Sequence, residues 1–164
     1  MRKSLMILVA AALVFVPVVV SAQSSASSNV TVTATVQRGL TMSPASATLD
    51  FGTVVAGAGA PTIAANGASA VPFSVQGHTS HAIHFTFANG TITHGTDNLT
   101  FTPAVIGGAT NNQASATAIT SGAGLTLSAA DPGVYYAWVG GSLNVVAGTP
   151  PGVYSGVWQL TVAY

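Results

Sequence analysis

The stretch Pro151-Gly-Val-Tyr-Ser-Gly-Val-Trp-Gln-Leu-Thr-Val-Ala-Tyr164 decides the fold class, because its side chains alternate in character. One row is largely apolar and consists of Tyr154, Gly156, Trp158, Leu160, Val162 and Tyr164. The intervening residues are mostly small or polar, and such a period of two is typical of a half-buried strand. Each buried aromatic side chain removes roughly 150–250 Å² from water. We therefore expect this row, apart from Gly156, to anchor a core that the rest of the chain completes.

Shorter alternating runs precede this stretch, and Gly, Pro or Asn residues separate them. The expected strands are 29–37, 47–55, 69–76, 82–88, 98–105, 116–120, 124–128 and 134–146. Pro103 is expected at an edge or a strand end, because proline lacks the N–H that a ladder needs. Many short strands without an amphipathic helix pattern predict an all-β, antiparallel sandwich of immunoglobulin-like type. The expected domain covers residues 29–164.

The amino terminus has the features of a cleaved signal peptide. Arg2 and Lys3 precede an apolar run from Leu5 to Val20, and small residues follow at Ser21 and Ala22. This order predicts a signal peptide over residues 1–22. A membrane anchor is the alternative, but the run is shorter than the ~20 residues of a spanning helix and contains a proline. Residues 23–28 are rich in Ser and Ala and are expected to form a flexible leader.

Charged residues are almost absent beyond the expected signal peptide. Only Arg38, Asp50, Asp97 and Asp131 remain, and the chain contains no cysteine. Nucleic-acid binding needs a basic surface, so we expect no nucleic-acid partner. The absence of cysteine excludes disulfides and thiolate metal sites. Low charge also means that little repulsion opposes the association of one copy with another.

The histidines and aspartates do not form a recognisable catalytic or metal-binding motif. His78, His81 and His84 are spaced by three, which places neighbours on opposite faces of a strand. A Ser-His-Asp set could be assembled on paper, but there is no Gly-x-Ser-x-Gly elbow and no paired acid and base. We expect no enzyme activity, no cofactor and no metal site.

Two blocks of the sequence resemble a known family. They are Leu49-Asp-Phe-Gly-Thr-Val-Val-Ala-Gly57 and the region from Val139-Gly-Gly-Ser-Leu-Asn-Val to the terminal stretch. Both resemble the bacterial exported proteins grouped as domain of unknown function 4402, which are similar in turn to the spore-coat-U type pilins. Those pilins usually carry cysteines, whereas this chain has none. The resemblance implies an immunoglobulin-like sandwich and surface fibres, and it supplies no catalytic residues.

The run 29–37 suggests how such a fibre could assemble. Val30, Val32, Ala34 and Val36 form one apolar row, which either packs in its own sandwich or fills the groove of a neighbour by β-augmentation. The expected function is a structural subunit of a secreted or cell-surface fibre, with this run as donor strand. The expected partners are further copies of the chain, and a chaperone is a candidate partner during export. Membrane contact is expected only through the signal peptide.

Two other functions remain open. A secreted carbohydrate- or surface-binding sandwich would use the loop 107–113 and an exposed Tyr135 or Tyr136. A small outer-membrane β-barrel would explain the aromatic carboxyl-terminal residue. Such a barrel needs about eight strands of roughly ten residues, and the expected strands here are shorter.

Overall fold

The computed structural model describes residues 26–164. The signal peptide predicted for residues 1–22 and the first residues of the leader lie outside the described residues. The chain divides into two units with a boundary between Thr35 and Val36. In the first unit, residues 26–35 contain no regular secondary structure. The second unit, Val36–Tyr164, contains every strand described below.

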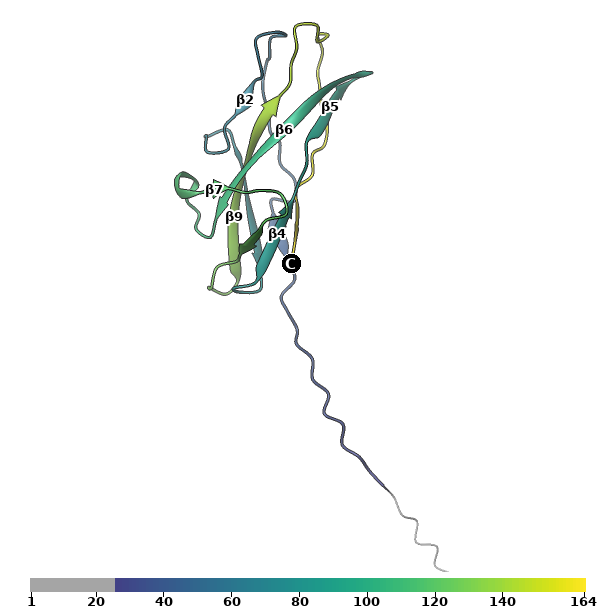
Figure 1. The fold of residues 1–164 in the computed structure, drawn as a ribbon, viewed down its shortest axis with the longest axis vertical. Helices are drawn as coiled ribbons and strands as arrows, with labels where there is room; N and C mark the ends of the chain where they lie inside the picture. Colours follow the sequence, from purple (N-terminus) through teal and green to yellow (C-terminus); the bar gives the residue numbers. More distant parts are fainter. Residues whose placement is uncertain (1–25) are drawn as a thin grey trace, which may run out of the picture. The chain divides into compact units, whose positions relative to one another are not determined.

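The second unit is built from two antiparallel sheets (Figure 1). The large sheet has the order β1 (Thr41–Ser43), β3 (Val71–Gly77), β9 (Gly133–Leu143), β6 (Asp97–Gly108) and β5 (Gly90–His94). Two short strands join it: β2 (Thr62–Ile63) pairs with β9, and β7 (Thr117–Ala118) pairs with β6. The small sheet has the order β10 (Thr161–Ala163), β4 (Ala82–Thr86) and β8 (Gly124–Thr126). The prediction of an all-β, antiparallel sandwich is confirmed.

Helical structure is minor in the described part of the chain. It amounts to one 3₁₀ turn, η1 (Gln113–Ser115), which Asn112 caps by accepting a hydrogen bond from the N–H of Ala114. Across residues 26–164, no helix has the length and apolar character needed to cross a membrane.

The two longest strands, β6 and β9, form the centre of the large sheet. Their register runs from Phe101 opposite Leu143 to Gly108 opposite Tyr136. Pro103 lies inside β6 and not at its end, but one edge of β6 is unpaired at this position, which agrees with the expectation of an edge or a strand end. At this point β6 pairs with β9 only, because the β5 ladder stops at Phe101 and the β7 ladder starts at Ile106. A residue without an N–H is tolerated where one edge of a strand is unpaired.

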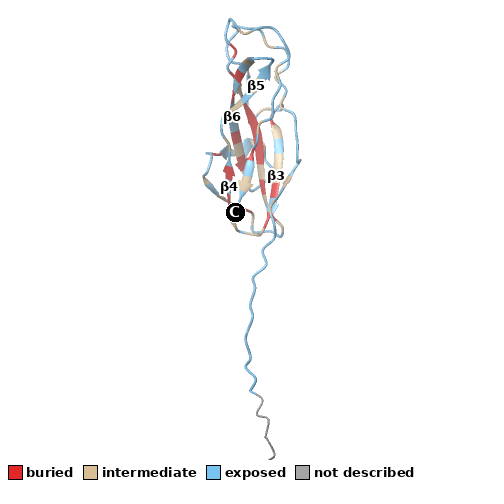
Figure 2. Cartoon of the chain, turned by 90° about the vertical axis from the view of Figure 1, so that its right-hand side faces the viewer, coloured by how far each residue is buried: buried red, intermediate tan, exposed pale blue. Residues whose placement is uncertain are grey.

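The core divides into two clusters of buried apolar side chains. Figure 2 colours the buried residues of the chain red. The first lies between the two sheets and includes Val75, Ile83, Phe85, Val105, Ile119, Leu127, Tyr135, Ala137, Val139 and Leu160. The second consists of Leu99, Phe101, Leu143 and Val145. The alternating runs at 69–76, 82–88 and 134–146 therefore place their apolar rows inside, as predicted. The small sheet supplies residues to the first cluster only, so other segments must cover the second.

Candidate functional site

The N-terminal segment, residues 29–37, is exposed along its whole length. The exposed fractions of Val30, Val32 and Val36 are 81%, 86% and 89%. The strand predicted for residues 29–37 is not formed in a single copy of the chain. An extended segment gains the stability of a strand only when its backbone groups pair with a neighbour. The row Val30, Val32, Ala34 and Val36 is thus apolar and unburied at once.

The terminal segment, residues 153–164, pairs with both sheets in turn. Ser155 exchanges two backbone hydrogen bonds with Thr93 of β5, at 2.9 and 3.1 Å. Farther along, β10 pairs with β4, with Val162 opposite Phe85. Residues 156–160 lie between these two pairings and form no ladder. The predicted continuous strand is therefore reduced to a bridge and a three-residue strand, because the segment crosses from one sheet to the other.

The predicted core row of this segment mostly faces inward. Leu160 is buried, and Tyr154, Trp158 and Val162 are partly buried against the core. Trp158 packs edge-on against Phe101 at 5.7 Å between ring centroids, and its indole Nε1 donates a 2.7 Å hydrogen bond to the carbonyl of Ala88. The opposite row is exposed, with Val157 at 96%.

A second segment without strand structure also covers the second core cluster. Leu49, Phe51 and Val54 pack against this cluster, yet residues 44–61 contain no strand. Tyr154 and Trp158 of the terminal segment pack against the same cluster. Leu49 and Phe51 therefore face the core as predicted, but the strand predicted for 47–55 is not formed. Part of the core is covered by side chains whose backbones are not joined in a sheet.

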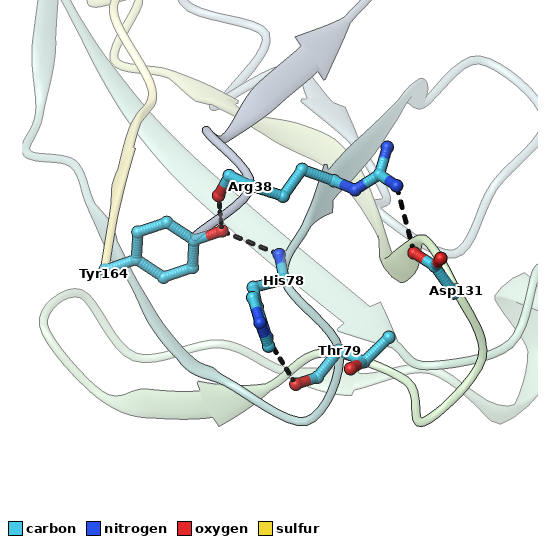
Figure 3. Close-up of polar contacts among 5 residues, drawn as sticks. All are labelled: Arg38, His78, Thr79, Asp131 and Tyr164. Carbon is cyan, nitrogen blue, oxygen red and sulfur yellow. Dashed lines mark hydrogen bonds and ion pairs between the residues drawn. The ribbon is translucent and has the colours of Figure 1, made fainter. Parts of the chain in front are cut away.

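Tyr164 is the last anchor residue, and its hydroxyl group joins three parts of the chain (Figure 3). The hydroxyl donates a hydrogen bond to the carbonyl of Arg38 and accepts one from the backbone N–H of His78, at 2.5 and 2.7 Å. The ring is 42% exposed, so Tyr164 serves more as a polar tie than as a core residue. It ties the backbone at Arg38 to the start of the turn that follows β3.

We expect Tyr164→Phe to destabilise the sandwich by about 1–3 kcal/mol, because the N–H of His78 and the carbonyl of Arg38 both lose a partner. Urea unfolding followed by tryptophan fluorescence measures this loss. Tyr136→Phe is the matched control, since no hydrogen bond involves its hydroxyl in the described residues and its cost should stay within about 0.5 kcal/mol. Equal costs for the two variants would contradict the role assigned to Tyr164.

Arg38 and Asp131 form an exposed ion pair beside this tie. The guanidinium Nη2 and the carboxylate Oδ1 are 3.1 Å apart, and the two side chains are 53% and 74% exposed. Together with His78 and Thr79 they line an open hollow of about 340 Å³. Exposed pairs of this kind add only about 0–1 kcal/mol to stability. The pair balances the local charge and contributes little to folding.

The structure brings two of the four histidines together. His78 and His81 lie in the turn between β3 and β4, with 4.2 Å between their ring centroids. His84 points to the carbonyl of Gly122, and His94 packs on Tyr154. The argument that histidines spaced by three lie on opposite faces of a strand does not apply to His78 and His81, because β3 ends at Gly77 and β4 begins at Ala82. Within residues 26–164 there is no cluster of three or more His, Asp or Glu that could hold a metal ion.

The residues considered for carbohydrate binding have different environments. Tyr135 is buried in the first core cluster, where burial raises the pKa of its phenol. The expectation of an exposed Tyr135 is wrong, because this residue belongs to the inward row of β9. Tyr136 lies on the opposite row, half-buried, and stacks on Trp138 at 6.4 Å. The loop expected at 107–113 begins later, since Gly107 and Gly108 belong to β6.

Sequence reasoning missed two features of this region. It did not find the gap in sheet coverage over the second core cluster, and it did not find the pairing of His78 with His81. The proximity of His78 and His81 depends on the turn between them, in which Ser80 has a positive φ of 56°. A serine in the sequence does not predict a positive φ, whereas glycine or asparagine at this position would have predicted it.

A family profile matches most of the chain. The profile of the family described as "Domain of unknown function (DUF4402)" matches residues 11–164. Neither the curated proteins nor the solved structures provide a match. Since the profile covers most of the chain, including both segments described above, the chain belongs to the DUF4402 family.

Proposed function

We propose that the chain is a structural subunit of a secreted or cell-surface fibre, and that the N-terminal segment of one copy completes the sandwich of the next. The observation that carries this proposal is the exposure of an alternating apolar row. Val30, Val32 and Val36 are each more than four-fifths exposed. Aliphatic side chains at every second position suit a strand with one buried face. A second copy can supply the face that the single copy lacks.

The acceptor is the terminal segment together with residues 44–55. Within the described residues, β10 pairs with β4 alone, so its other edge is free. Within residues 26–164, the segments 44–55 and 156–160 also have no ladder partner. An extended peptide that adds to a free edge gains main-chain hydrogen bonds, and its alternate side chains enter the pockets beneath. The second core cluster, covered by side chains without a sheet, is the apolar surface on which such a peptide would pack.

The proposed donor and acceptor contain similar numbers of residues. The run 29–37 has nine residues, which span about 30 Å when extended, and the terminal segment from Val153 to Ala163 has eleven. Complete burial of a valine contributes about 1.5–3 kcal/mol. The stabilisation from three buried valines and the ladder hydrogen bonds is therefore of the same order as the free-energy cost of bringing two copies together, about 4–15 kcal/mol. Low charge removes a further obstacle, because Arg38 and Asp131 already neutralise one another.

Return of the segment to its own sandwich is the competing arrangement. It would require a reversal at Arg38-Gly39, where the Arg38 carbonyl is held by Tyr164 and β1 follows at Thr41. Exchange between copies needs no such reversal, and head-to-tail repetition gives a filament. The proposal includes two further points. The chain is similar to the spore-coat-U type pilins, and a chaperone binds it during export.

Electron microscopy of the purified mature protein tests the proposal. We expect filaments from the chain beginning at Gln23, and a folded, non-polymerising or less stable monomer after deletion of residues 23–37. Size-exclusion chromatography at rising concentration gives the same comparison in solution. A full mature chain that stays monomeric at high concentration would exclude a fibre built in this way.

A further inference from the structure

The outward row of β9 carries two aromatic side chains that belong to neither core cluster. Tyr135, Ala137 and Val139 point into the first cluster, so Tyr136 and Trp138 lie on the outer face of the large sheet. Their rings stack with 6.4 Å between centroids and an inclination of 28°. Trp138 is 6% exposed and Tyr136 is half-buried. Of the two rings, Tyr136 therefore offers more of its surface to solvent.

The outer face is closed at the Trp138 end. Gly140 lies two residues farther along the same row, and the backbone of Ile63 and Ala65 lies directly over it. Gln113 holds this covering loop in place, because its Nε2 donates two hydrogen bonds to it, the shorter one of 2.7 Å to the carbonyl of Ala65. The Oε1 atom of the same amide has no partner within residues 26–164. An acceptor in a fixed orientation is thus left for a ligand.

The outer face is open at the Tyr136 end. Gly108 of β6 lies directly opposite Tyr136 in the ladder. A Cβ atom at Gly108 would meet no atom closer than the carbonyl oxygen of Thr110, at 3.9 Å. The loop that follows carries exposed amide side chains at Asn111 and Asn112. Open space therefore lies above Gly108, next to Tyr136 on one strand and to the amide-bearing loop on the other.

The polar atoms of the two stacked rings are also without protein partners. In the part of the chain that the structure describes, no hydrogen bond involves the Tyr136 hydroxyl or Trp138 Nε1, and neither is a buried atom. An indole N–H and a phenol O–H remain strong hydrogen-bonding groups, so both bond either to water or to a ligand. The indole of Trp158 differs, because it already donates to the carbonyl of Ala88.

This face offers hydrogen-bonding groups and no charge. Beyond residue 22, the charged side chains of the chain are Arg38 and three aspartates. Asp97 begins β6, at the far end of that strand from Gly108. Asp131 precedes β9 and is paired with Arg38 at 3.1 Å, and the third aspartate lies between β1 and β2. A charged ligand would find no counter-ion here, so the face suits a neutral one.

The main chain is not available for peptide recognition on this face. At Tyr136, β9 is paired with Ser74 of β3 on one side and with Gly108 of β6 on the other. Strand addition needs an unpaired edge, so a ligand here contacts side chains alone. Aromatic rings with a few polar groups in fixed positions suit a ligand that has an apolar face and a polar rim. A pyranose sugar has a face of C–H groups and a rim of hydroxyl groups.

We propose that this outer face binds a neutral oligosaccharide. The ring of Tyr136 packs against the C–H face of one pyranose unit, which occupies the open space above Gly108. The indole N–H of Trp138 donates to a sugar hydroxyl group, and the amide oxygen of Gln113 accepts from another. Every residue of the site belongs to one copy, and none belongs to the proposed acceptor, so the site does not depend on fibre formation.

Calorimetric titration of the mature protein with cellopentaose, maltopentaose and chitopentaose tests the site. We expect at least one of these neutral sugars to bind, with an affinity that high salt does not weaken, because no ion pair is involved. Tyr136→Ala should weaken binding at least about tenfold, since it removes the aromatic contact. Lack of binding by all three sugars at millimolar concentration would overturn the proposal.

A variant that fills the open space separates binding from folding. Gly108→Val should weaken binding at least about tenfold, because its side chain occupies the place of the sugar. It should leave the urea midpoint unchanged, since Gly108 has no positive φ and valine suits a strand. Thr102→Val is the matched control, because Thr102 is exposed on the same outward row of β6. Equal affinities of the two variants would contradict the assigned place of the sugar.

The two tryptophans provide a readout on the unaltered protein. Trp138 and Trp158 are the only tryptophans of the chain, so an NMR spectrum of isotope-labelled protein, in solution or in the solid state, has two indole N–H signals. The bound sugar should shift the signal of Trp138 and leave that of Trp158, which is bonded to Ala88 at 2.7 Å. Equal shifts of both signals, or a shift of neither, would place the sugar elsewhere and overturn the assignment.

Discussion

Val32→Asp should abolish assembly while leaving the single copy folded. The side chain is 86% exposed in one copy, so the substitution should cost no more than about 0.5 kcal/mol of folding free energy. In the proposed fibre the same position faces the second core cluster of the next copy. A carboxylate without a partner in a buried position costs about 3–5 kcal/mol. This penalty lowers the association constant by roughly 10²–10⁴-fold.

Sedimentation velocity and electron microscopy measure the effect, and urea unfolding shows whether the monomer is intact. Thr33→Asp is the matched control, since Thr33 is adjacent, is equally an exposed residue in one copy, and belongs to the row that faces solvent after strand addition. It should assemble nearly as well as the parent chain. If Val32→Asp and Thr33→Asp assemble alike, the apolar row is not the contact surface.

The acceptor can be examined separately with a peptide. The chain lacking residues 23–37 should bind a synthetic peptide of residues 29–37, and binding should be lost when the peptide carries Val32→Asp. Fluorescence of Trp158 should report on this event, because its ring is partly exposed beside Phe101 in the proposed acceptor. Binding of both peptides with equal affinity would contradict the proposed register of alternate side chains in pockets.

The facing of side chains could be predicted from the sequence wherever a strand has one wet and one dry face. In β4, Ile83 and Phe85 are completely buried and His84 is exposed, as alternation requires. The same rule places Leu160 inside and Val157 outside. It places Leu49 and Phe51 correctly even though no strand forms there. Burial of alternate side chains is a local consequence of extended backbone, so a local pattern suffices to predict it.

Ladder pairing was less predictable, because it depends on residues far away in the chain. Ser155 pairs with Thr93, and β10 pairs with β4, so the terminal segment changes sheets between the two contacts. Nothing in the residues 156–160 specifies this crossing. The sequence predicted an edge or a strand end for Pro103, but only the ladders show that it lies inside β6, where β5 and β7 leave one edge free. Pairing is decided by topology, which periodicity does not encode.

One candidate feature could be predicted from the sequence and the other could not. The apolar row of residues 29–37 is evident in the sequence, and its exposure is what the structure adds. The proximity of His78 and His81 was not predictable, because it arises from a turn with a left-handed serine at position 80. A spacing of three has a meaning in a helix or a strand, but in a turn it depends on individual backbone angles.

Phe85→Ala should cause the largest loss of stability among single substitutions in the small sheet. Phe85 is completely buried, lies on the central strand of that sheet, and packs on Tyr135 with 5.9 Å between ring centroids. Its removal leaves a cavity between the sheets, and Phe→Ala changes of this kind cost about 3–5 kcal/mol. Since small domains have a total stability of about 5–15 kcal/mol, a large part of the folding free energy would be lost.

Urea unfolding of the chain lacking residues 23–37 is the appropriate measurement, because assembly cannot then stabilise the variant. Thr86→Ala is the matched control on the same strand, with an exposed side chain, and should cost no more than about 0.5 kcal/mol. The comparison also bears on the fibre, since β4 holds β10 in place and β10 offers the free edge. Phe85→Ala should therefore weaken binding of the 29–37 peptide as well as folding, whereas Val32→Asp in the donor affects binding alone. A loss below about 1 kcal/mol for Phe85→Ala would mean that the small sheet does not depend on its central aromatic side chain. It would contradict the role given to Phe85 in holding β10 of the proposed acceptor.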